Sequence, residues 1–350
     1  MHTISIQTSH PYYAHVGSDL LPHCGELITA ITDARVCALI TDTHVAPLYA
    51  QSVCTSLRNA GFTVHIYTIP AGEAQKTLSS CAKILSFFAQ IELTRTDFVI
   101  ALGGGVIGDI AGFCAAIYQR GIDFIQIPTT LLAACDASVG GKTAVDLPEG
   151  KNLAGAFHQP RLVICDTDTF QTLPQKVFSD GTAEIIKHAL IADASLFHDL
   201  LEQDIQKDME RIVYRNIAIK AAVVAADERE HGQRKLLNFG HTLGHAIEKC
   251  SGFQMPHGSA VAIGMVLVTR AAQRLGYTPP DTLDKIFPLL HRFGLPCDCP
   301  YHTNALYTAA IADKKRTGNS MDLVILNQIG NAGTVRLSLD EFRAFVEAAQ

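Results

Sequence analysis

Short β-rich runs alternate with helical runs from residue 35 onward, and this alternation constrains the fold more than any other feature of the chain. A strand followed by a helix and another strand forms a βαβ unit, whose two strands lie parallel in one sheet. The expected strands are residues 35–41, 63–69, 97–102, 123–127 and 162–166, and the first helices are residues 45–60 and 75–90. The pattern therefore predicts an α/β domain with a parallel sheet.

Strand signals nearly stop after Thr172, and helical periodicity replaces them. The expected helices are residues 181–192, 209–227, 241–250, 258–275 and 339–349. With 350 residues, 48% of them hydrophobic, the chain can form two sizeable cores. We therefore predict two domains with a boundary near residue 172.

The composition limits the class of partner. A net charge of -6 argues against nucleic acid and anionic membranes as partners, because both select basic surfaces. The first twenty residues lack the pattern of a secretory signal, and the ten cysteines are scattered without a CxxC motif. The apolar residues 98–118 contain Asp109 and five glycines, so a strand, a turn and a helix explain them better than a membrane span. We predict a soluble, cytoplasmic protein that binds a small molecule.

The segment from Gly103 to Gly108 has the pattern G-x-G-x-x-G, directly after an expected buried strand and at the start of a helix. Glycines there let the backbone approach a pyrophosphate, whose charge is met by N–H groups at the helix N-terminus. The acidic residue that usually follows about twenty positions later is not evident. Asp42, at the end of the first strand, is an alternative ribose ligand. The pattern favours a dinucleotide.

His241 and His245 are four residues apart and share one face of an expected helix, a spacing that suits a metal ion. Thr242 stands where the zincin motif H-E-x-x-H has its general base. His257 can supply another imidazole and Glu184 a carboxylate, and two histidines with one carboxylate leave an open position on Zn²⁺, as in catalytic sites. Because the chain has 15 histidines, a chance pair of surface or core histidines stays an open alternative.

Several cations lie beside glycine, asparagine or apolar runs. They are Lys142, Lys151, Lys187, Lys220, Arg234, Lys314 and Lys315. In an acidic protein such cations favour a substrate with phosphate and carboxylate groups, although ordinary solvated lysines are the alternative.

Motifs in a fixed order extend over nearly the whole chain. They are residues 103–109, 128–132, 136–142, 150–152, 183–187, 238–245 and 257–258. Together they resemble the 3-dehydroquinate synthase family, and their shared order and spacing make this resemblance far more specific than any single pattern.

The resemblance implies a Rossmann-like dinucleotide-binding domain over residues 1–172 and an all-α metal- and substrate-binding domain over residues 173–350. It places the active site in the cleft between them and implies NAD⁺ with Zn²⁺, or Co²⁺, as cofactors. It also implies a homodimer in which Arg120 reaches the active site of the neighbouring subunit.

Site residues follow from the resemblance position by position. The metal ligands are Glu184, His241 and His257, and the acid/base histidine is His245. The dinucleotide positions are Asp42, Glu73, Lys76, Gly104, Gly105, Asp109, Thr129, Thr130, Lys142, Lys151 and Thr172. The catalytic and substrate positions are Asp136, Lys142, Lys151, Asn152, Lys187, Lys220, Arg234, Asn238, and Lys314 or Lys315.

Three positions depart from the family pattern. Thr182 stands where the family usually has Met, His188 where it has Tyr, and Ser259 where it has Glu. None of these removes a ligand. The change at Ser259 leaves the support of His257 open, and such support tunes a metal site strongly.

The reaction that the resemblance implies converts 3-deoxy-D-arabino-heptulosonate 7-phosphate into 3-dehydroquinate and phosphate, in the shikimate pathway to aromatic amino acids. This carbon–oxygen lyase reaction comprises transient oxidation, β-elimination of phosphate, re-reduction and intramolecular aldol closure. Three alternatives stay open. They are a metal- and NAD-dependent polyol or alcohol dehydrogenase of the same fold, another sugar phosphate cyclase, and an inactive scaffold, which would lack ligands.

Overall fold

The computed structural model describes residues 1–312, 316–317 and 319–350, and the chain forms two compact units. Unit 1 comprises Met1–Leu173 and Met209–Arg229, and unit 2 comprises Pro174–Asp208 and Glu230–Gln350. Residues 209–229, which our sequence-based division assigned to the C-terminal domain, belong by their contacts to unit 1.

Unit 1 is built on a seven-stranded sheet with the strand order β1-β2-β9-β6-β5-β3-β4. Its strands are β1 (His2–Ile6), β2 (Tyr12–Gly17), β3 (Val36–Asp42), β4 (Thr63–Ile69), β5 (Phe98–Gly103), β6 (Asp123–Pro128) and β9 (Leu162–Asp166). β1 pairs with β2 antiparallel. All other neighbouring strands in this order, from β2 at one side to β4 at the opposite edge, pair parallel. The predicted α/β fold with a parallel sheet is confirmed.

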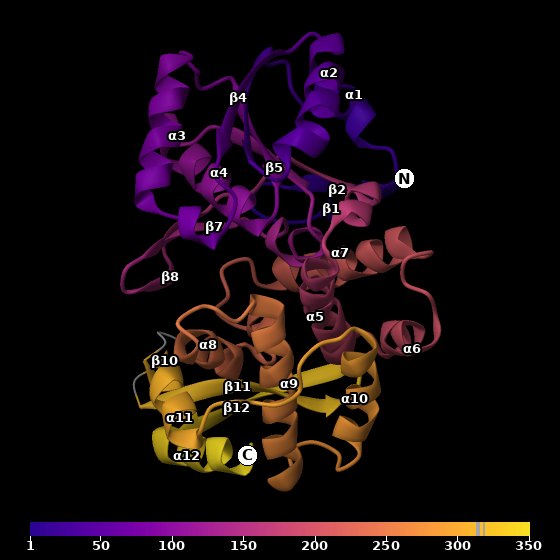
Figure 1. Cartoon of the computed structure of the whole chain (residues 1–350), viewed down its shortest axis with the longest axis vertical. Coiled ribbons are helices and arrows are strands. Elements are labelled where there is room, and N and C mark those ends of the chain that lie inside the picture. The colour runs from indigo at the N-terminus through magenta and orange to yellow at the C-terminus, as the bar shows by residue number, and fades with distance from the viewer. Residues whose placement is uncertain (313–315, 318) are drawn as a thin grey trace. The chain divides into compact units, whose positions relative to one another are not determined.

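Helices cover both faces of this sheet. They are α1 (Cys24–Thr29), α2 (Gln51–Asn59), α3 (Leu78–Gln90) and α4 (Gly105–Ile117). Leu39 and Ile100 point into the core under α1 and α2, whereas Ala38 and Val99 point into the core under α3 and α4. Figure 1 shows these two helix pairs on opposite sides of the strands. Because both faces are covered, all six residues of β5 are apolar or glycine and buried.

Further elements complete unit 1. They are α7 (Met209–Ala226), the strands β7 (Lys142–Leu147) and β8 (Gly150–Phe157), and the short helical turns η1 (Leu21–His23), η2 (Ala46–Ala50), η3 (Glu73–Gln75), η4 (Tyr118–Arg120), η5 (Ala133–Ala137) and η6 (Thr167–Thr172). β7 and β8 form an antiparallel hairpin that packs on α4, and α7 packs on β1 at the edge of the sheet. The sequence pattern did not indicate this hairpin.

Unit 2 is mainly helical, as expected, although it is not the all-α domain that the resemblance implied. Its helices are α5 (Gln175–Ala192), α6 (Ala194–Glu202), η7 (Gln233–Asn238), α8 (His241–Cys250), α9 (His257–Arg274), α10 (Thr282–Arg292), α11 (Thr303–Ile311) and α12 (Leu339–Ala348). α9 is the central helix, because it packs against α5, α8, α10 and α12 (Figure 1). Most of its residues are therefore buried.

Unit 2 also contains a small antiparallel sheet that the sequence pattern did not indicate. Its strands are β10 (Arg316–Thr317), β11 (Ser320–Gln328) and β12 (Asn331–Ser338), in the order β10-β11-β12. β11 packs against α9 and η7. Within the described ranges, no helix has both the length and the apolar character that a bilayer span requires.

Candidate metal and dinucleotide sites

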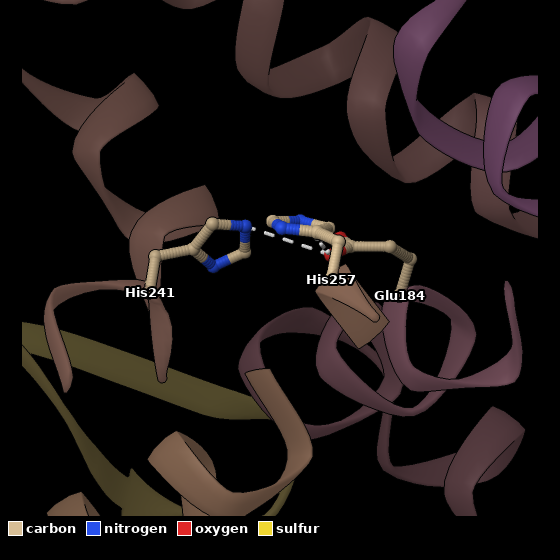
Figure 2. A group of neighbouring side chains, drawn as sticks. All are labelled: Glu184, His241 and His257. Carbon is tan, nitrogen blue, oxygen red and sulfur yellow. Dashed lines mark ion pairs between the residues drawn. The ribbon is translucent and has the colours of Figure 1, made fainter. Parts of the chain in front are cut away.

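Three side chains of unit 2 converge on one point. The Oε1 atom of Glu184 on α5 lies 3.5 Å from Nε2 of His241 on α8 and 3.5 Å from Nε2 of His257, the first residue of α9 (Figure 2). Two ligands of a tetrahedral Zn²⁺, each about 2.0–2.1 Å from the ion, lie roughly 3.4 Å apart. The spacing and the donor set therefore fit a divalent cation.

Close helix packing brings these ligands together. A Cβ atom on Gly264 of α9 would lie 2.1 Å from the carbonyl oxygen of Gly240, which directly precedes His241. A Cβ atom on Gly258, which follows His257, would lie 1.9 Å from the carbonyl oxygen of Asp180 on α5. Only glycine permits such backbone contacts. The two glycines therefore let α8 and α5 approach α9 at the level of the ligands.

The second nitrogen of each ligand imidazole also faces an acceptor. Nδ1 of His241 lies 3.1 Å from the carbonyl oxygen of Phe239, and Nδ1 of His257 lies 3.5 Å from Oε2 of Glu248. An acceptor at Nδ1 favours the tautomer with its proton there, which leaves the lone pair of Nε2 for a metal ion. Both imidazoles are therefore oriented as metal ligands.

Charges around the cluster shift the pKa values of the two histidines in opposite directions. Burial, together with the nearby ammonium of Lys187, lowers the pKa of His241 well below its ordinary value, so this imidazole is neutral near pH 7. Burial also acts to lower the pKa of His257, but the carboxylates of Glu184 and Glu248 outweigh it and raise this pKa to about 10. A cation bound here takes the place of that proton.

Lys187 lies against the metal cluster. Its buried Nζ pairs with Oε2 of Glu184 one turn earlier on α5, and both side chains are at most 1% exposed. The pair holds the carboxylate so that its Oε1 faces the histidines. Lys187 therefore contacts a candidate metal ligand. The sequence predicted a role for Lys187 at the substrate but did not predict this contact.

His245 lies beside the ligands. Its ring centroid is 5.5 Å from that of His241 and 6.0 Å from that of His257. Unlike His241 it is only partly buried. The geometry therefore suits a group that exchanges protons next to a cation.

Two further candidate residues of unit 2 lie on η7. Arg234 is 1% exposed, and Asn238 donates from Nδ2 to Oε1 of Glu230 at 2.6 Å. The turn is anchored by Lys235, whose Nζ lies 2.8 Å from Oδ2 of Asp322 on β11. The small sheet thus fixes the turn that carries Arg234 and Asn238. Lys314 and Lys315 lie outside the described residues.

The glycine turn in unit 1 leads from β5 into α4. Gly104 is the N-cap of α4 and Gly105 its first residue, so the first-turn N–H groups point out of the helix end. A Cβ atom on Gly104 would lie 3.0 Å from Cγ2 of Thr130, which leaves little room for a side chain. Within the described part of the chain, the buried Oγ1 of Thr129 has no hydrogen-bond partner. These features fit a bound pyrophosphate.

A buried ammonium connects α4 with the hairpin. Nζ of Lys76 lies 2.6 Å from Oδ2 of Asp109 and donates to Oδ1 of Asn152 at 2.5 Å. Burial acts to lower the pKa of Lys76, but Asp109 and neighbouring carboxylates outweigh it and raise this pKa, so the ammonium stays charged. Beside it, Nζ of Lys151 lies 3.8 Å from Oε1 of Glu73. Five expected dinucleotide or substrate residues therefore lie together.

Three other dinucleotide candidates of unit 1, Asp42, Thr130 and Thr172, form hydrogen bonds within the unit. Oδ1 of Asp42 accepts hydrogen bonds from the backbone N–H groups of His44 and Val45. Thr172 contacts the hydroxyl of Tyr49 at 2.5 Å, and Oγ1 of Thr130 accepts from the N–H of Ala133 at 3.2 Å.

Asp136 and Lys220 form an ion pair in unit 1, with Oδ1 2.5 Å from Nζ. Lys142 begins β7. Arg120 ends η4 and is exposed, with a left-handed φ of 67°.

The open question at Ser259 has a structural answer. Its N–H and hydroxyl donate to Oδ1 of Asp180 at 2.7 and 3.1 Å, so the carboxylate of Asp180 caps the start of α9. The carboxylate beside Nδ1 of His257 is that of Glu248 on α8. Sequence reasoning missed Glu248, although His241, His245 and Glu248 follow an i, i+4, i+7 pattern on one helix face. Thr182 and His188 are buried on α5, and Thr182 donates to the carbonyl oxygen of Ser179.

The two sites define a class of protein: an α/β unit with a dinucleotide-type glycine turn, joined in one chain to a helical unit with a cluster of two histidines and a carboxylate. The family models described as 3-dehydroquinate synthase N-terminal and C-terminal match residues 66–180 and 181–316. The 3-dehydroquinate synthase of Streptococcus gordonii is 42% identical over 345 residues, which is 97% of each chain. The chain therefore belongs to the 3-dehydroquinate synthase family.

Solved structures extend this similarity to related enzymes. A 2-deoxy-scyllo-inosose synthase complexed with carbaglucose-6-phosphate, NAD⁺ and Co²⁺ has a TM-score of 0.87 at 25% identity and 99% coverage of both chains. The 2-epi-5-epi-valiolone synthase of Streptomyces hygroscopicus, with NAD⁺ and Zn²⁺ bound, has a TM-score of 0.88 at 26% identity, covering 99% of this chain and 97% of that one.

Proposed function

We propose that this chain converts 3-deoxy-D-arabino-heptulosonate 7-phosphate into 3-dehydroquinate and phosphate, with NAD⁺ and Zn²⁺ or Co²⁺ as cofactors. The observation that carries the proposal is the convergence of Glu184, His241 and His257, whose ligand atoms have the spacing of a tetrahedral cation site. Membership of the family and the NAD⁺- and metal-bound relatives support it.

When bound, the two cofactors would supply chemistry that side chains lack, namely reversible hydride acceptance by NAD⁺ and acidification by the cation of the hydroxyl to be oxidised. Glu184, His241 and His257 hold the cation. The N-terminus of α4, with Thr129 and Lys76 nearby, holds the dinucleotide. Because the hydride is returned, no nicotinamide is consumed in a turnover.

His245 is the proposed acid/base group. Its partly buried ring lies beside the cation ligands, where it can take the proton of the hydroxyl that is oxidised and pass protons during elimination and ring closure.

Buried cations are proposed to bind the two anionic groups of the substrate. Arg234 is 1% exposed and Lys220, which pairs with Asp136, is 5% exposed, so packing holds both cations in fixed positions from which they can bind an anion. The substrate has a carboxylate at one end and a phosphate at the other. We assign Arg234, Lys220, Asn238, Lys142 and Asn152 to these groups and to the leaving phosphate.

The test follows both phosphate and NADH. Purified protein is mixed with the heptulosonate phosphate and a catalytic amount of NAD⁺, with and without a chelator. We expect many equivalents of phosphate per NAD⁺, no net rise in absorbance at 340 nm, and loss of activity with the chelator. A stoichiometric rise at 340 nm without phosphate release would instead identify a dehydrogenase, and turnover of a different sugar phosphate would identify another cyclase.

We further propose a homodimer in which Arg120 completes the site of the neighbouring subunit. Two observations support this role: the side chain is exposed and so accessible to a neighbouring subunit, and its left-handed φ of 67° is unusual for a residue other than glycine. The test mixes two inactive variants, Arg120→Ala and His245→Ala, after joint unfolding and refolding. In a mixed dimer one site has both residues intact, so activity should return. A mixture that stays as inactive as its components contradicts the shared site.

The proposed compartment is the cytoplasm. All ten cysteines lie in the described part of the chain as thiols outside disulfides, and seven of them are buried, as is usual for proteins kept under reducing conditions. Fractionation of cells that produce the protein, followed by detection with an antibody, tests this location.

A further inference from the structure

Glu248 is a buried carboxylate for which the proposed reaction has no direct use. It lies on α8, is 2% exposed, and follows His245 by three residues and His241 by seven. These spacings place its side chain on the helix face that carries both histidines. Burying a carboxylate is costly unless charged or hydrogen-bonding groups compensate it, so its neighbours indicate its role.

The neighbours of Glu248 are imidazoles. Its Oε2 lies 3.5 Å from Nδ1 of His257 on α9, and ligand-type atoms of Glu248, His245 and His257 all lie within 4.8 Å of one another. Ser259 is directed elsewhere, because its N–H and hydroxyl bind Asp180. The carboxylate next to the far nitrogen of His257 therefore comes from α8 and not from α9.

The position of this carboxylate determines which nitrogen of His257 faces the cation. A carboxylate at Nδ1 favours a proton on that nitrogen and leaves the lone pair of Nε2 directed at Oε1 of Glu184. His241 has the same arrangement, but its acceptor is the backbone carbonyl of Phe239. Of these two acceptors, only the carboxylate beside Nδ1 of His257 belongs to a side chain, so only that one can be removed by a substitution.

We propose that Glu248 is a positioning residue that sets the tautomer and ring orientation of His257 and thereby strengthens cation binding. This inference rests on the proposed cation site. It assigns to α8 two tasks: His241 binds the cation directly, and Glu248 holds the ligand that α9 contributes.

The test measures cation binding in the absence of substrate. Metal-free wild type, Glu248→Gln, Glu248→Ala and Ser259→Ala proteins are titrated with Co²⁺, with a chromophoric chelator as competitor, and the visible ligand-field spectrum is recorded. We expect Co²⁺ affinity to fall about 10-fold in Glu248→Gln and up to about 100-fold in Glu248→Ala, with a changed spectrum. Ser259→Ala, which disturbs the start of α9 without touching the imidazole, should bind as wild type does.

The outcomes separate this inference from the proposed function. If wild type and Glu248→Gln bind Co²⁺ equally and with the same spectrum, while His241→Ala does not bind it, the role of Glu248 is wrong and the cation site stands. If wild type itself binds no Co²⁺, the cation site fails and the inference fails with it. Glu248→Gln keeps the shape of the side chain, and equal melting temperatures of the metal-free proteins exclude a general loss of structure.

Discussion

The two units assemble their candidate sites in different ways. In unit 1 the glycine turn lies in one short segment, where β5 ends at Gly103 and α4 begins at Gly105. In unit 2 the ligands Glu184, His241 and His257 come from three helices, of which α5 is distant in sequence from the consecutive helices α8 and α9. The first site therefore depends mainly on local backbone geometry, whereas the second depends on how helices pack. Substitutions far from the chemistry should disturb the second site more than the first.

The largest effect is expected from His241→Ala. It removes one of three ligands, so the cation would be held by Glu184 and His257 alone. We expect loss of cation retention by at least about 100-fold and no detectable activity, measured by metal analysis after dialysis and by phosphate release. His245→Ala is the control, because it should keep the cation and lose rate by roughly 10²–10⁴. Full cation occupancy in His241→Ala would remove the ligand assignment.

Gly264→Ala tests whether packing controls the site of unit 2. The new Cβ would lie 2.1 Å from the carbonyl oxygen of Gly240, so α8 and α9 must separate. We expect a loss of about 1–3 kcal/mol of stability and clearly weaker Co²⁺ binding, measured by thermal unfolding and titration. The control is Gly333→Ala on β12, where the new Cβ meets only the movable side chain of Asn327, at 3.3 Å. Unchanged Co²⁺ affinity in Gly264→Ala would show that the site does not depend on this contact.

Gly104→Ala is the matching change in unit 1. The added methyl lies 3.0 Å from Cγ2 of Thr130 and occupies the space where a pyrophosphate would approach the start of α4. We expect NADH affinity to fall about 10-fold, equal to about 1.4 kcal/mol, by fluorescence titration. Co²⁺ binding should not change. The comparison fails if Gly104→Ala weakens Co²⁺ binding as much as Gly264→Ala does.

The smallest effect concerns Asp322, which anchors η7. Hydrogen bonds from Arg336 and Lys235 hold the pKa of Asp322 far below its ordinary value of 3.8. A carboxyl group whose pKa is lower in the folded than in the unfolded state stabilises the protein at pH values above the unfolded-state pKa. This contribution disappears as the pH falls through the folded-state pKa. Asp322→Asn should therefore lose up to about 1 kcal/mol at pH 7, and the difference from wild type should shrink below about pH 4. Urea unfolding at several pH values tests this, and a difference that grows toward low pH contradicts the assignment.

Much of the sheet of unit 1 could be predicted from the sequence. β4 and β9 have the limits that the pattern indicated. β9 is buried along its whole length and is an almost continuous apolar run, whereas the edge strand β4 is only partly buried and was recognised by its β-branched and aromatic residues. β11 and β12 were missed. The run Leu323 to Leu326 in β11 is apolar and short enough to suit a strand or a buried helix, and periodicity alone does not separate the two.

The metal cluster could be predicted only in part. Spacing singled out His241 and His245, which are four residues apart, but the pair whose Nε2 atoms meet Glu184 is His241 and His257. That pairing arises from tertiary contact between α8 and α9. The sequence named His257 and Glu184 only as possible donors, and the family resemblance assigned them as ligands. The contacts of Glu248 and the capping of α9 by Asp180 depend on the same packing. Spacing along one helix does not reveal them.

The interruption of unit 1 by residues 174–208 has a consequence for biosynthesis. Helix α7 returns to β1, and Glu210 at its start accepts hydrogen bonds from the backbone N–H and the hydroxyl of Ser18. When only the first 173 residues have left the ribosome, the sheet of unit 1 therefore lacks the helix that packs on its edge strand β1. A fragment that ends at residue 173 would encode an incomplete unit 1. We therefore expect the two parts of the chain to fold together and to give little folded protein when they are expressed separately.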